Sequence, residues 1–258
     1  MPPSESGMAY AESWRRRRQE AVHDPQGGMC MEDARYDEQR RAMVTTQIAA
    51  RGMTDPAVLA AMRTVPREAF VMPRDVPCAY DDRPLPIGEG QTISQPYIVA
   101  LMAEALQLST TDRVLEIGTG SGYAAALLSC LAAQVYTVER LAVLYRLARR
   151  RLRTLGYANV LVHLGNGTLG WPEHAPYDGI VVMAGGPAVP TALQDQLAVG
   201  GRLVLPVGAR PTRQTLVRVR RTSDTTYAQE DLGAVCFVPL IGTQGWPEAQ
   251  PLGETSAW

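Results

Sequence analysis

A glycine-rich stretch, RVLEIGTGSGYAAALL at residues 113–128, contains the residues of this chain that are best suited to bind a cofactor. The pattern predicts a buried strand, a tight turn and the start of a helix, which is a frequent setting for a nucleotide-like ligand. Glycine lets the backbone turn sharply and lets a ligand approach it closely. We therefore predict that the turn itself contacts the cofactor, through Gly118, Thr119, Gly120, Ser121 and Gly122.

The acidic residue before this turn indicates which cofactor it suits. Glu116 stands at the end of the predicted strand, just before Gly118. A carboxylate there repels a pyrophosphate, because two like charges about 4 Å apart cost roughly 4 kcal/mol at an effective dielectric constant of about 20. The GxGxG spacing also differs from the GxGxxG of dinucleotide sites. S-adenosyl-L-methionine is cationic and has no phosphate, so the sequence favours it; the alternative role for Glu116 is a partner of the helix dipole.

Two further loops are expected to contact the nucleoside. Glu139 ends the second predicted strand, with Arg140 beside it, and a carboxylate at that place accepts hydrogen bonds from both ribose hydroxyls. The alternative for Glu139 is a solvated helix start. After the third strand, the loop Gly165–Asn166–Gly167 is expected at the adenine edge, where the Asn166 amide can accept from the exocyclic amine and donate to a ring nitrogen. A simple Asn-Gly turn is the alternative for this loop.

An alternation of strands and helices must hold these loops. Alternation with apolar strands predicts a mostly parallel sheet covered on both faces, and the last two strands, with no long helix between them, are expected to pair antiparallel at its edge. The predicted fold is α/β: a doubly wound, Rossmann-like, seven-stranded sheet. The expected strands are 113–117, 134–138, 159–163, 179–183, 202–207, 214–220 and 234–239, and the expected helices lie near 121–132, 141–155 and 190–197.

Three helices are expected before the sheet. The first, DEQRRAMVTTQIAARGM, has apolar residues at helical spacing and ends at Gly52, a C-cap signal. The second, TDPAVLAAMRTVP, begins with Thr54 or Asp55 as N-cap. The third is SQPYIVALMAEALQL, with Pro96 in its first turn. These helices form the predicted N-terminal helical subregion.

The domain organisation follows from these patterns. Residues 1–33 are polar and rich in Arg, Glu, Gly and Pro, and we expect a mobile extension there. Residues 34–241 are expected to form one domain, with helices and an active-site loop over 34–110 and the cofactor-binding sheet over 111–241. Residues 242–258 are rich in Pro and Gly and are expected to form a loose tail.

Composition excludes several classes of function. The chain has 258 residues, 46% of them apolar, and a formal net charge of −1, which gives no support for binding to nucleic acid or to a membrane surface. No secretory signal is recognisable at the start. Four cysteines lie far apart and form no CxxC pair, so reduced thiols are expected, and neither disulfides nor a metal site. We expect a cytoplasmic monomer.

Several segments together resemble one enzyme family. They are, in order, VPREAFV, DDRPLPIGEGQTISQPYIVALMAE, VLEIGTGSGY, YTVER, LGW, GGRLVLPVG and FVPL, and they resemble the protein-L-isoaspartate O-methyltransferases over about residues 36 to 241. The pair GQTISQP and EIGTGSGY is specific to that family. The resemblance implies methyl transfer from S-adenosyl-L-methionine to the free α-carboxylate of L-isoaspartyl residues in damaged peptides and proteins. The methyl ester then closes to a succinimide, which reopens in part to aspartate.

The resemblance also implies where the acceptor binds. The segment TISQP borders the active site of such enzymes, so Ser94 is implied as the active-site residue, with Thr92 beside it. Ile93, Gln95 and Pro96 are implied to contact the substrate, and the loop YDDRPLPIGEGQ to cover the cofactor. The alternative for Ser94 is the N-cap of the helix that follows.

Departures from the family pattern keep two other functions open. Asn166 stands where the family usually has an aspartate, and VVMAGGP replaces a more usual run of Thr and Ala, so Met183, Gly185 and Gly186 are expected to reshape the pocket. Some relatives methylate an aspartate in a ribosomally made, modified peptide and drive it to an aspartimide. A non-catalytic module that binds S-adenosyl-L-methionine is the other alternative.

The acceptor itself simplifies the expected chemistry. A carboxyl group has a pKa near 4 and is ionised at neutral pH, so no general base is required. The three histidines agree, because His163 is expected in the core or at the rim and neither His23 nor His174 lies in a catalytic motif. Placement of the carboxylate oxygen in line with the departing sulfur, at about 3 to 3.5 Å, and exclusion of water remain as the tasks of the protein.

Overall fold

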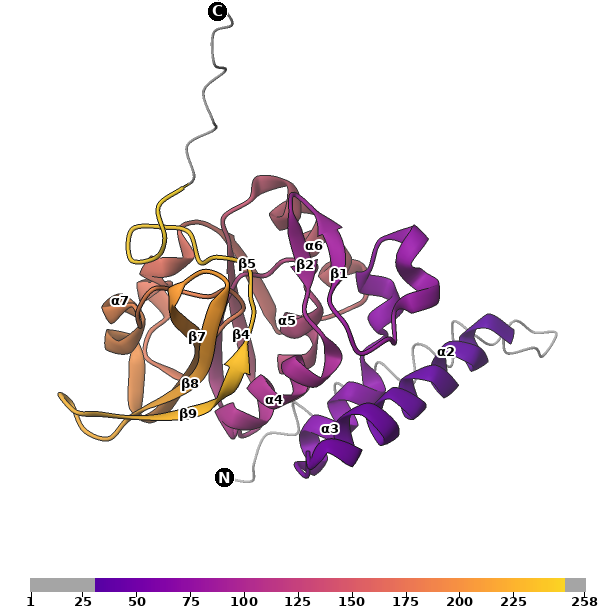
Figure 1. Cartoon of the computed structure of the whole chain (residues 1–258), viewed down its shortest axis with the longest axis horizontal. Helices are drawn as coiled ribbons and strands as arrows, with labels where there is room; N and C mark the ends of the chain where they lie inside the picture. Colours follow the sequence, from indigo (N-terminus) through magenta and orange to yellow (C-terminus); the bar gives the residue numbers. More distant parts are fainter. Residues whose placement is uncertain (1–30, 249–258) are drawn as a thin grey trace, which may run out of the picture.

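The computed structural model describes residues 31–248, and their centre is a single sheet (Figure 1). Its strands are β3 (Arg113–Ile117), β4 (Gln134–Glu139), β5 (Val160–Leu164), β6 (Tyr177–Val182), β7 (Leu197–Arg210), β8 (Arg213–Arg221) and β9 (Tyr227–Val235). The order is β5-β4-β3-β6-β7-β8-β9, parallel from β5 to β7, with β8 and β9 added antiparallel. The predicted fold class is confirmed, including the antiparallel pair at the edge.

Helices cover both faces of this sheet because its strands are apolar on both sides. Successive side chains of a strand point to opposite faces. Val114 and Val181 therefore belong to one apolar cluster and Leu115 and Ile180 to another. The first face carries α4 (Pro96–Leu106), α5 (Tyr123–Leu128) and α6 (Ala142–Thr154). The second carries η5 (Gly167–Leu169), η6 (Pro172–His174) and α7 (Thr191–Asp195).

The N-terminal helical subregion packs on the first face, at the lower right of Figure 1. Its first helix continues as a π and then a 3₁₀ turn to Gly52, whose φ of 93° ends it, as predicted. Asp55 caps α3 by accepting from the amides of Ala57 and Val58 at 2.8 and 3.1 Å. The elements are α2 (Met31–Ala42), η1 (Met43–Ile48), η2 (Ala49–Arg51), α3 (Pro56–Thr64), η3 (Arg67–Phe70) and η4 (Pro73–Cys78).

A two-stranded hairpin follows, where the sequence predicted a loop. It consists of β1 (Leu85–Gly88) and β2 (Gln91–Ile93), paired antiparallel. Leu85, Ile87 and Ile93 are buried, which explains why this short ribbon holds its place. Glu89 bridges the two strands with a φ of 53°. The prolines next to and inside β1 hid the strand pattern in the sequence.

Four predicted elements differ in extent. One of them, the strand predicted at 202–207, is longer than expected, because β7 spans Leu197–Arg210. The predicted strand 234–239 is wrong over most of its length, because β9 pairs residues 227–235 with β8. The segment YAQEDLGAV is polar and mostly exposed, as an edge strand allows, and it carries no alternating apolar signal. The helix predicted at 121–132 is limited to α5, and the one at 190–197 is limited to α7 because Leu197 already belongs to β7.

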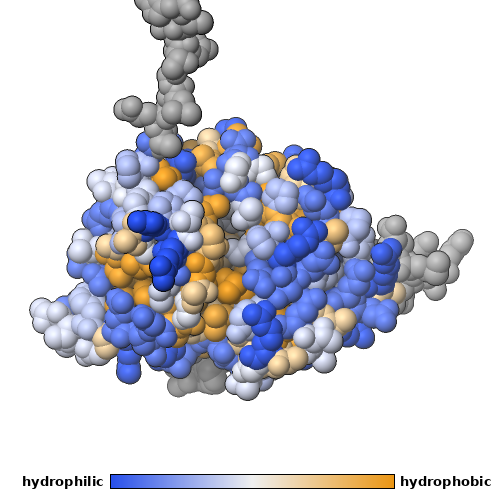
Figure 2. Space-filling model, viewed as in Figure 1, coloured by the Kyte–Doolittle hydropathy of each residue, from blue (hydrophilic) through white to orange (hydrophobic). Residues whose placement is uncertain are grey.

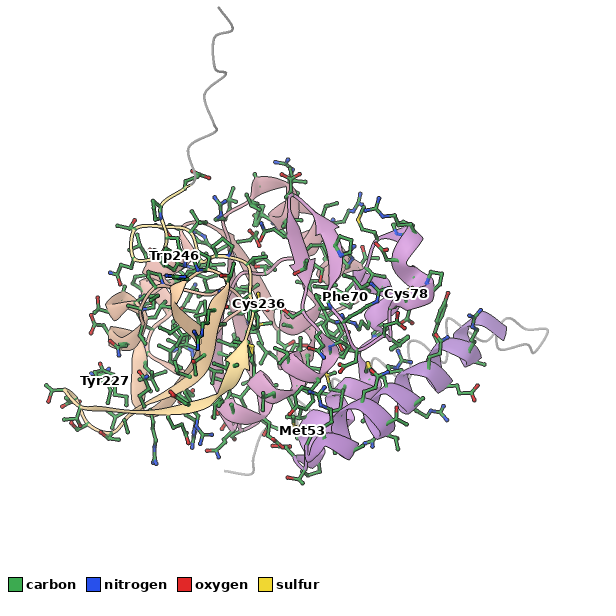
Figure 3. All side chains as sticks on the ribbon, in the orientation of Figure 1. Met53, Phe70, Cys78, Tyr227, Cys236 and Trp246 are labelled. Atoms are coloured by element: carbon green, nitrogen blue, oxygen red, sulfur yellow. The ribbon has the colours of Figure 1, made fainter. Side chains whose placement is uncertain are left out.

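The end of the described chain is packed rather than loose. Residues 242–248 fold back over the sheet, and the Trp246 indole donates to the carbonyl of Gly185 at 3.0 Å. Figure 3 labels Trp246 near β7. The prediction of a loose tail is therefore wrong for 242–248, and residues 249–258 lie outside the described residues. The same holds for residues 1–30 of the predicted extension, whereas 31–33 begin α2.

Polar and apolar side chains gather over different parts of the surface. Figure 2 shows a mainly polar surface over the N-terminal helices and a gathering of apolar side chains left of centre, over the part of the sheet that contains β7 to β9. No helix within residues 31–248 is long and apolar enough to cross a membrane.

Candidate active site

One pocket of about 780 Å³, counted with its open mouth, lies at the carboxyl ends of β3, β4 and β6. Ligands of open α/β sheets bind at this end of the strands. The hairpin forms one wall and the glycine loop forms another. Of the sixteen predicted site residues, eleven line this pocket: Thr92, Ile93, Ser94, Glu116, Gly118, Thr119, Gly120, Ser121, Glu139, Arg140 and Gly167.

The glycine loop takes a shape that only glycine adopts readily. Gly118, Gly120 and Gly122 have φ values of 93°, 52° and 91°, all in the left-handed region. The amide of Gly118 donates to the carbonyl of Val138 at 2.9 Å, which ties the loop to β4. A methyl group on Gly120 would lie 3.2 Å from Ile87 of the hairpin. The loop is therefore held between β4 and β1, close to both.

Glu139 is fixed by the main chain around it. Its Oε2 accepts from the Gly120 amide at 2.8 Å, and its Oε1 accepts from the Leu141 amide at 2.9 Å. The side chain is buried and lines the pocket. Each carboxylate oxygen has two lone pairs, so each keeps one free to accept a further hydrogen bond.

Glu116 lies deeper, at the floor of the pocket. Thr137 donates to its Oε2 at 2.5 Å, and Thr119 lies 2.6 Å from Thr137. Its Oε1 is buried without a hydrogen-bond partner. Burial, and to a lesser extent the nearby Glu139, raise the pKa of Glu116 to about 8, and the hydrogen bond from Thr137 opposes this rise.

The hairpin brings Thr92 and Ser94 to the same pocket. The alternative role of Ser94 as N-cap is wrong, because α4 has Gln95 as its N-cap residue. The carboxylate of Asp82 does the capping from the preceding loop: it accepts from the Tyr97 amide at 3.2 Å and from the Gln95 side chain at 2.7 Å. The Ser94 side chain is therefore not used as a helix cap.

Five predicted site residues lie outside the pocket lining. Asn166 caps η5, and its Oδ1 accepts from both the amide and the hydroxyl of Thr168. Its amide donates to Thr243 at 2.9 Å. Both acceptor positions of Oδ1 are therefore occupied, so the predicted contact with the adenine amine is not supported. The other four are Gly122, Gly165, Gln95 and Pro96.

Sequence reasoning also missed part of the lining. Residues 238–241 cross the pocket, where Pro239 forms a parallel bridge to Gly185. We call residues 238–248 the strap. Its Gln244 amide donates to the Thr168 hydroxyl at 3.1 Å, and its Glu248 pairs with Arg140 at 3.0 Å. The motif FVPL marked this segment, but nothing in it indicated a wall of the pocket. The other lining residues that were not predicted as site residues are Gln91, Val99, Ile117, Tyr123, Ala124, Val138, Leu141, Leu144, Met183 and Ala184. Of these, only Met183 and Gln91, the last residue of the loop YDDRPLPIGEGQ, were expected near the pocket.

The pocket fits S-adenosyl-L-methionine. Two buried carboxylates face it, and the unpartnered Oε1 of Glu116 suits a cation. An anionic phosphate would lie beside the Glu139 carboxylate, which repels it. His163 and His174 stack with Trp171 and Tyr136 and do not line the pocket. The sheet order, the glycine loop after β3 and the acidic ends of β3 and β4 define a class I S-adenosylmethionine-dependent methyltransferase.

Comparison with known proteins identifies the family within this class. The family model described as Protein-L-isoaspartate(D-aspartate) O-methyltransferase matches residues 38–245. Protein-L-isoaspartate O-methyltransferase 2 of Pelobacter propionicus is 64% identical over 207 residues, covering 80% of this chain and 92% of the relative. Protein-L-isoaspartate O-methyltransferase 1 of Geotalea uraniireducens is 63% identical over 209 residues, covering 81% and 95%. The chain belongs to the protein-L-isoaspartate O-methyltransferase family.

Solved structures agree with this assignment. A protein-L-isoaspartate O-methyltransferase superimposes with a TM-score of 0.72 at 31% identity, covering 80% of this chain and 67% of the other. A Plasmodium falciparum structure described as the same kind of enzyme, in complex with S-adenosyl-L-homocysteine, gives 0.68 at 23% identity and covers 78% and 98%. The second likeness shows that the fold is shared.

Proposed function

We propose that Thr92 and Ser94 hold the acceptor carboxylate while the glycine loop, Glu116 and Glu139 hold the cofactor. The chain is a protein carboxyl O-methyltransferase that acts on L-isoaspartyl residues, with S-adenosyl-L-methionine as the methyl donor. One observation carries the residue assignment: the hairpin and the glycine loop line the same pocket. The residues proposed to hold the methyl acceptor and those proposed to hold the methyl donor therefore line the same pocket. We call them the acceptor side and the donor side.

The donor side depends on charge and on free acceptor atoms. When bound, S-adenosyl-L-methionine supplies a methyl group on a positively charged sulfur. The free lone pairs of Glu139 are available for the two ribose hydroxyls, because the backbone amides use only one on each oxygen. Glu116 offers its unpartnered Oε1 to a cationic group. Arg140 and Gly167 complete the nucleoside wall.

The acceptor side needs placement rather than proton transfer. An α-carboxylate is ionised at neutral pH, so no residue has to remove a proton from it. The hydroxyls of Thr92 and Ser94 can each donate a hydrogen bond to the carboxylate or to the adjacent peptide, and a bond of that kind to a charged group contributes about 1.5–3 kcal/mol. Ile93, Gln95 and Pro96 are proposed to contact the peptide.

Exclusion of water is the second task of the protein. Positive and negative charges neutralise each other during the transfer, so water that solvates them slows the reaction. Apolar residues of the strap, Val238, Leu240 and Ile241, line the pocket together with Ile93 of the hairpin. These two segments are the walls that keep water from the reacting groups.

We propose that the preference for isoaspartate comes from the extra methylene in the peptide backbone. That methylene shifts the carboxylate relative to the peptide, so a site that hydrogen-bonds the backbone places one isomer and misplaces the other. The methyl ester is then attacked by the next backbone nitrogen, which expels methanol and closes a succinimide. Hydrolysis of the succinimide returns part of it as aspartate.

We further propose that the protein acts as a cytoplasmic monomer and binds neither nucleic acid nor membranes. The near-neutral net charge of −1 supports the exclusion of polyanions as partners. Among residues 31–248, Cys78, Cys130 and Cys236 form no disulfide, and this agrees with the reducing compartment that we propose.

A mass-spectrometric assay tests the function. The protein is incubated with S-adenosyl-L-methionine and three peptides of matched composition that contain aspartate, isoaspartate or a macrocycle with an aspartate. We expect one added methyl group on the isoaspartyl peptide and none on the aspartyl peptide. Methylation of the macrocyclic peptide alone would assign the protein to peptide tailoring. Cofactor binding by calorimetry with no methylation of any peptide would identify a binding module.

A further inference from the structure

Arg67 is a buried cation without a carboxylate in contact. Its side chain is completely inaccessible to solvent, and within residues 34–248 no acidic group lies within ion-pair distance of it. Burial lowers the pKa of Arg67, while the surrounding Tyr123, Tyr80 and Asp82 raise it. A buried charge is costly unless hydrogen bonds compensate for it. The motif VPREAFV contains this arginine, and the residue roles proposed above do not use it.

The compensation comes from two main-chain carbonyls. Arg67 Nε donates to the carbonyl of Ala79 at 2.8 Å, and Nη2 donates to the carbonyl of Ser94 at 2.8 Å. These two residues stand at the two ends of the segment 80–93, which contains the hairpin. The guanidinium therefore joins both ends of the hairpin segment at one point.

The same guanidinium reaches the donor side of the pocket. Its Cζ lies 4.9 Å from the centre of the Tyr123 ring. Tyr123 is the first residue of α5, directly after the glycine loop, and it lines the pocket. Phe70, labelled in Figure 3, follows Arg67 in η3 and packs edge-on against the same ring at 5.7 Å. Arg67 is thus the link between the hairpin base and the first turn of α5.

We propose that Arg67 is a positioning residue for methyl transfer: it fixes the base of the hairpin so that Thr92 and Ser94 face the methyl donor. This proposal rests on the acceptor role proposed for Thr92 and Ser94. Arginine suits the task because its planar fork donates in two directions while its flat face lies on a ring. Lysine keeps the charge but cannot hold both carbonyls in that geometry.

The test compares R67K with a matched control, R113K. Arg113 also donates to a backbone carbonyl, that of His174 at 2.6 Å, and also lies over a tyrosine ring, that of Tyr136 at 5.5 Å. Arg113 is at the opposite end of β3 from the pocket. The two substitutions therefore remove the same kind of contact, one at the hairpin and one elsewhere.

Two measurements are made on folded protein. Hydrogen exchange of the cofactor-free protein should be about tenfold faster or more over residues 85–95 in R67K than in wild type, since the lost bond to a charged group is worth at least that factor. R113K should leave that segment unchanged. With an isoaspartyl peptide, kcat/KM of R67K should fall about 10- to 100-fold, as expected for a misplaced acceptor. The cofactor Kd should stay within about twofold, because lysine keeps a cation beside the Tyr123 ring and no residue proposed to bind the cofactor is replaced.

Other outcomes separate the possible failures. Wild-type exchange over 85–95 in R67K, or an unchanged kcat/KM, would overturn the positioning role. An equal loss of cofactor affinity and of kcat/KM would also overturn it and make Arg67 a general structural residue. If wild type methylates no isoaspartyl peptide, the proposed function fails, while the exchange comparison still decides whether Arg67 holds the hairpin. If R67K does not fold, R67Q, which keeps a planar donor without the charge, is measured in the same way.

Discussion

The carboxylate of Glu139 accepts a hydrogen bond from the amide of Gly120 at 2.8 Å, and this contact joins the end of β4 to the glycine loop after β3. The second carboxylate oxygen binds the Leu141 amide at the start of α6. One side chain therefore sets the geometry of three segments around the nucleoside side of the pocket.

Replacement of Glu139 by alanine is expected to weaken cofactor binding at least about tenfold, since hydrogen bonds to a charged group are each worth about 1.5–3 kcal/mol. The substitution removes the acceptors for the ribose and also the brace of the glycine loop. Isothermal titration with S-adenosyl-L-homocysteine measures the change. E230A, at an exposed glutamate on β9, is the control. Wild-type affinity in E139A would remove Glu139 from the ribose role.

S94A is expected to lower kcat for an isoaspartyl peptide by about 10-fold or more, because one hydrogen bond to the acceptor carboxylate is lost. The cofactor Kd should not change, since Ser94 lies on the hairpin side of the pocket. Stability should change little, because the side chain does not cap α4. Steady-state kinetics and calorimetry test this, with the exposed S223A as control. Equal turnover in S94A and wild type would leave Ser94 without a direct role.

Glu116 makes the stability of the cofactor-free protein depend on pH. Its pKa is raised to about 8 by burial, above the ordinary value of 4.5. Between these values the unfolded chain ionises Glu116 before the folded chain does, so the protein loses stability as pH rises through this window. E116Q cannot ionise. Its Tm should therefore match wild type near about pH 5 and exceed it near about pH 9. A constant difference at all pH values would contradict the raised pKa.

Cofactor binding should also change the protonation of Glu116. A cation beside Oε1 favours the ionised carboxylate, so binding at neutral pH should release a proton from wild type and none from E116Q. Calorimetry in two buffers of different ionisation enthalpy counts the protons. The control is E230Q, which keeps Glu116. Equal proton release from E116Q and wild type would assign the proton to another group.

The strap should contribute to cofactor binding through Trp246. W246F removes the bond from the indole to the Gly185 carbonyl, which costs about 0.5–1.5 kcal/mol, and the cofactor Kd should rise by about 2- to 10-fold. The matched control is W171F, because Trp171 packs against Tyr136 away from the pocket. Fluorescence or calorimetric titration measures the difference. An unchanged Kd in W246F would show that the strap holds its place without this bond.

The sheet and the donor side of the pocket could be predicted from the sequence. Apolar strands alternating with helices leave a strong periodic signal, and Gly118 and Glu139 stand at the strand ends where a parallel sheet brings them together. These features follow from the local hydrophobic pattern and from the rule that ligands of open α/β sheets bind at the carboxyl ends of the strands. The resemblance added Thr92 and Ser94, whose place in the pocket no periodicity indicated.

The remaining parts depend on contacts between distant segments. The hairpin has a proline inside β1, so its pattern resembles a loop, and the burial of Ile87 and Ile93 holds it in place. The strap shows no hydrophobic periodicity, and hydrogen bonds from Trp246 to Gly185 and from Gln244 to Thr168 determine its course. Asn166 looked free to contact adenine, but Thr168 and the strap occupy its side chain. None of these contacts leaves a local signal.

Arg67 donates both hydrogen bonds to main-chain oxygens, so these bonds do not depend on which side chains occupy positions 79 and 94. A library of side chains at Ser94 would therefore sample different acceptor chemistries on one unaltered backbone. A replacement of the ribbon between these anchors would have to keep the buried Ile87 and Ile93, so a redesign for other carboxylates begins at Thr92 and Ser94, which line the pocket.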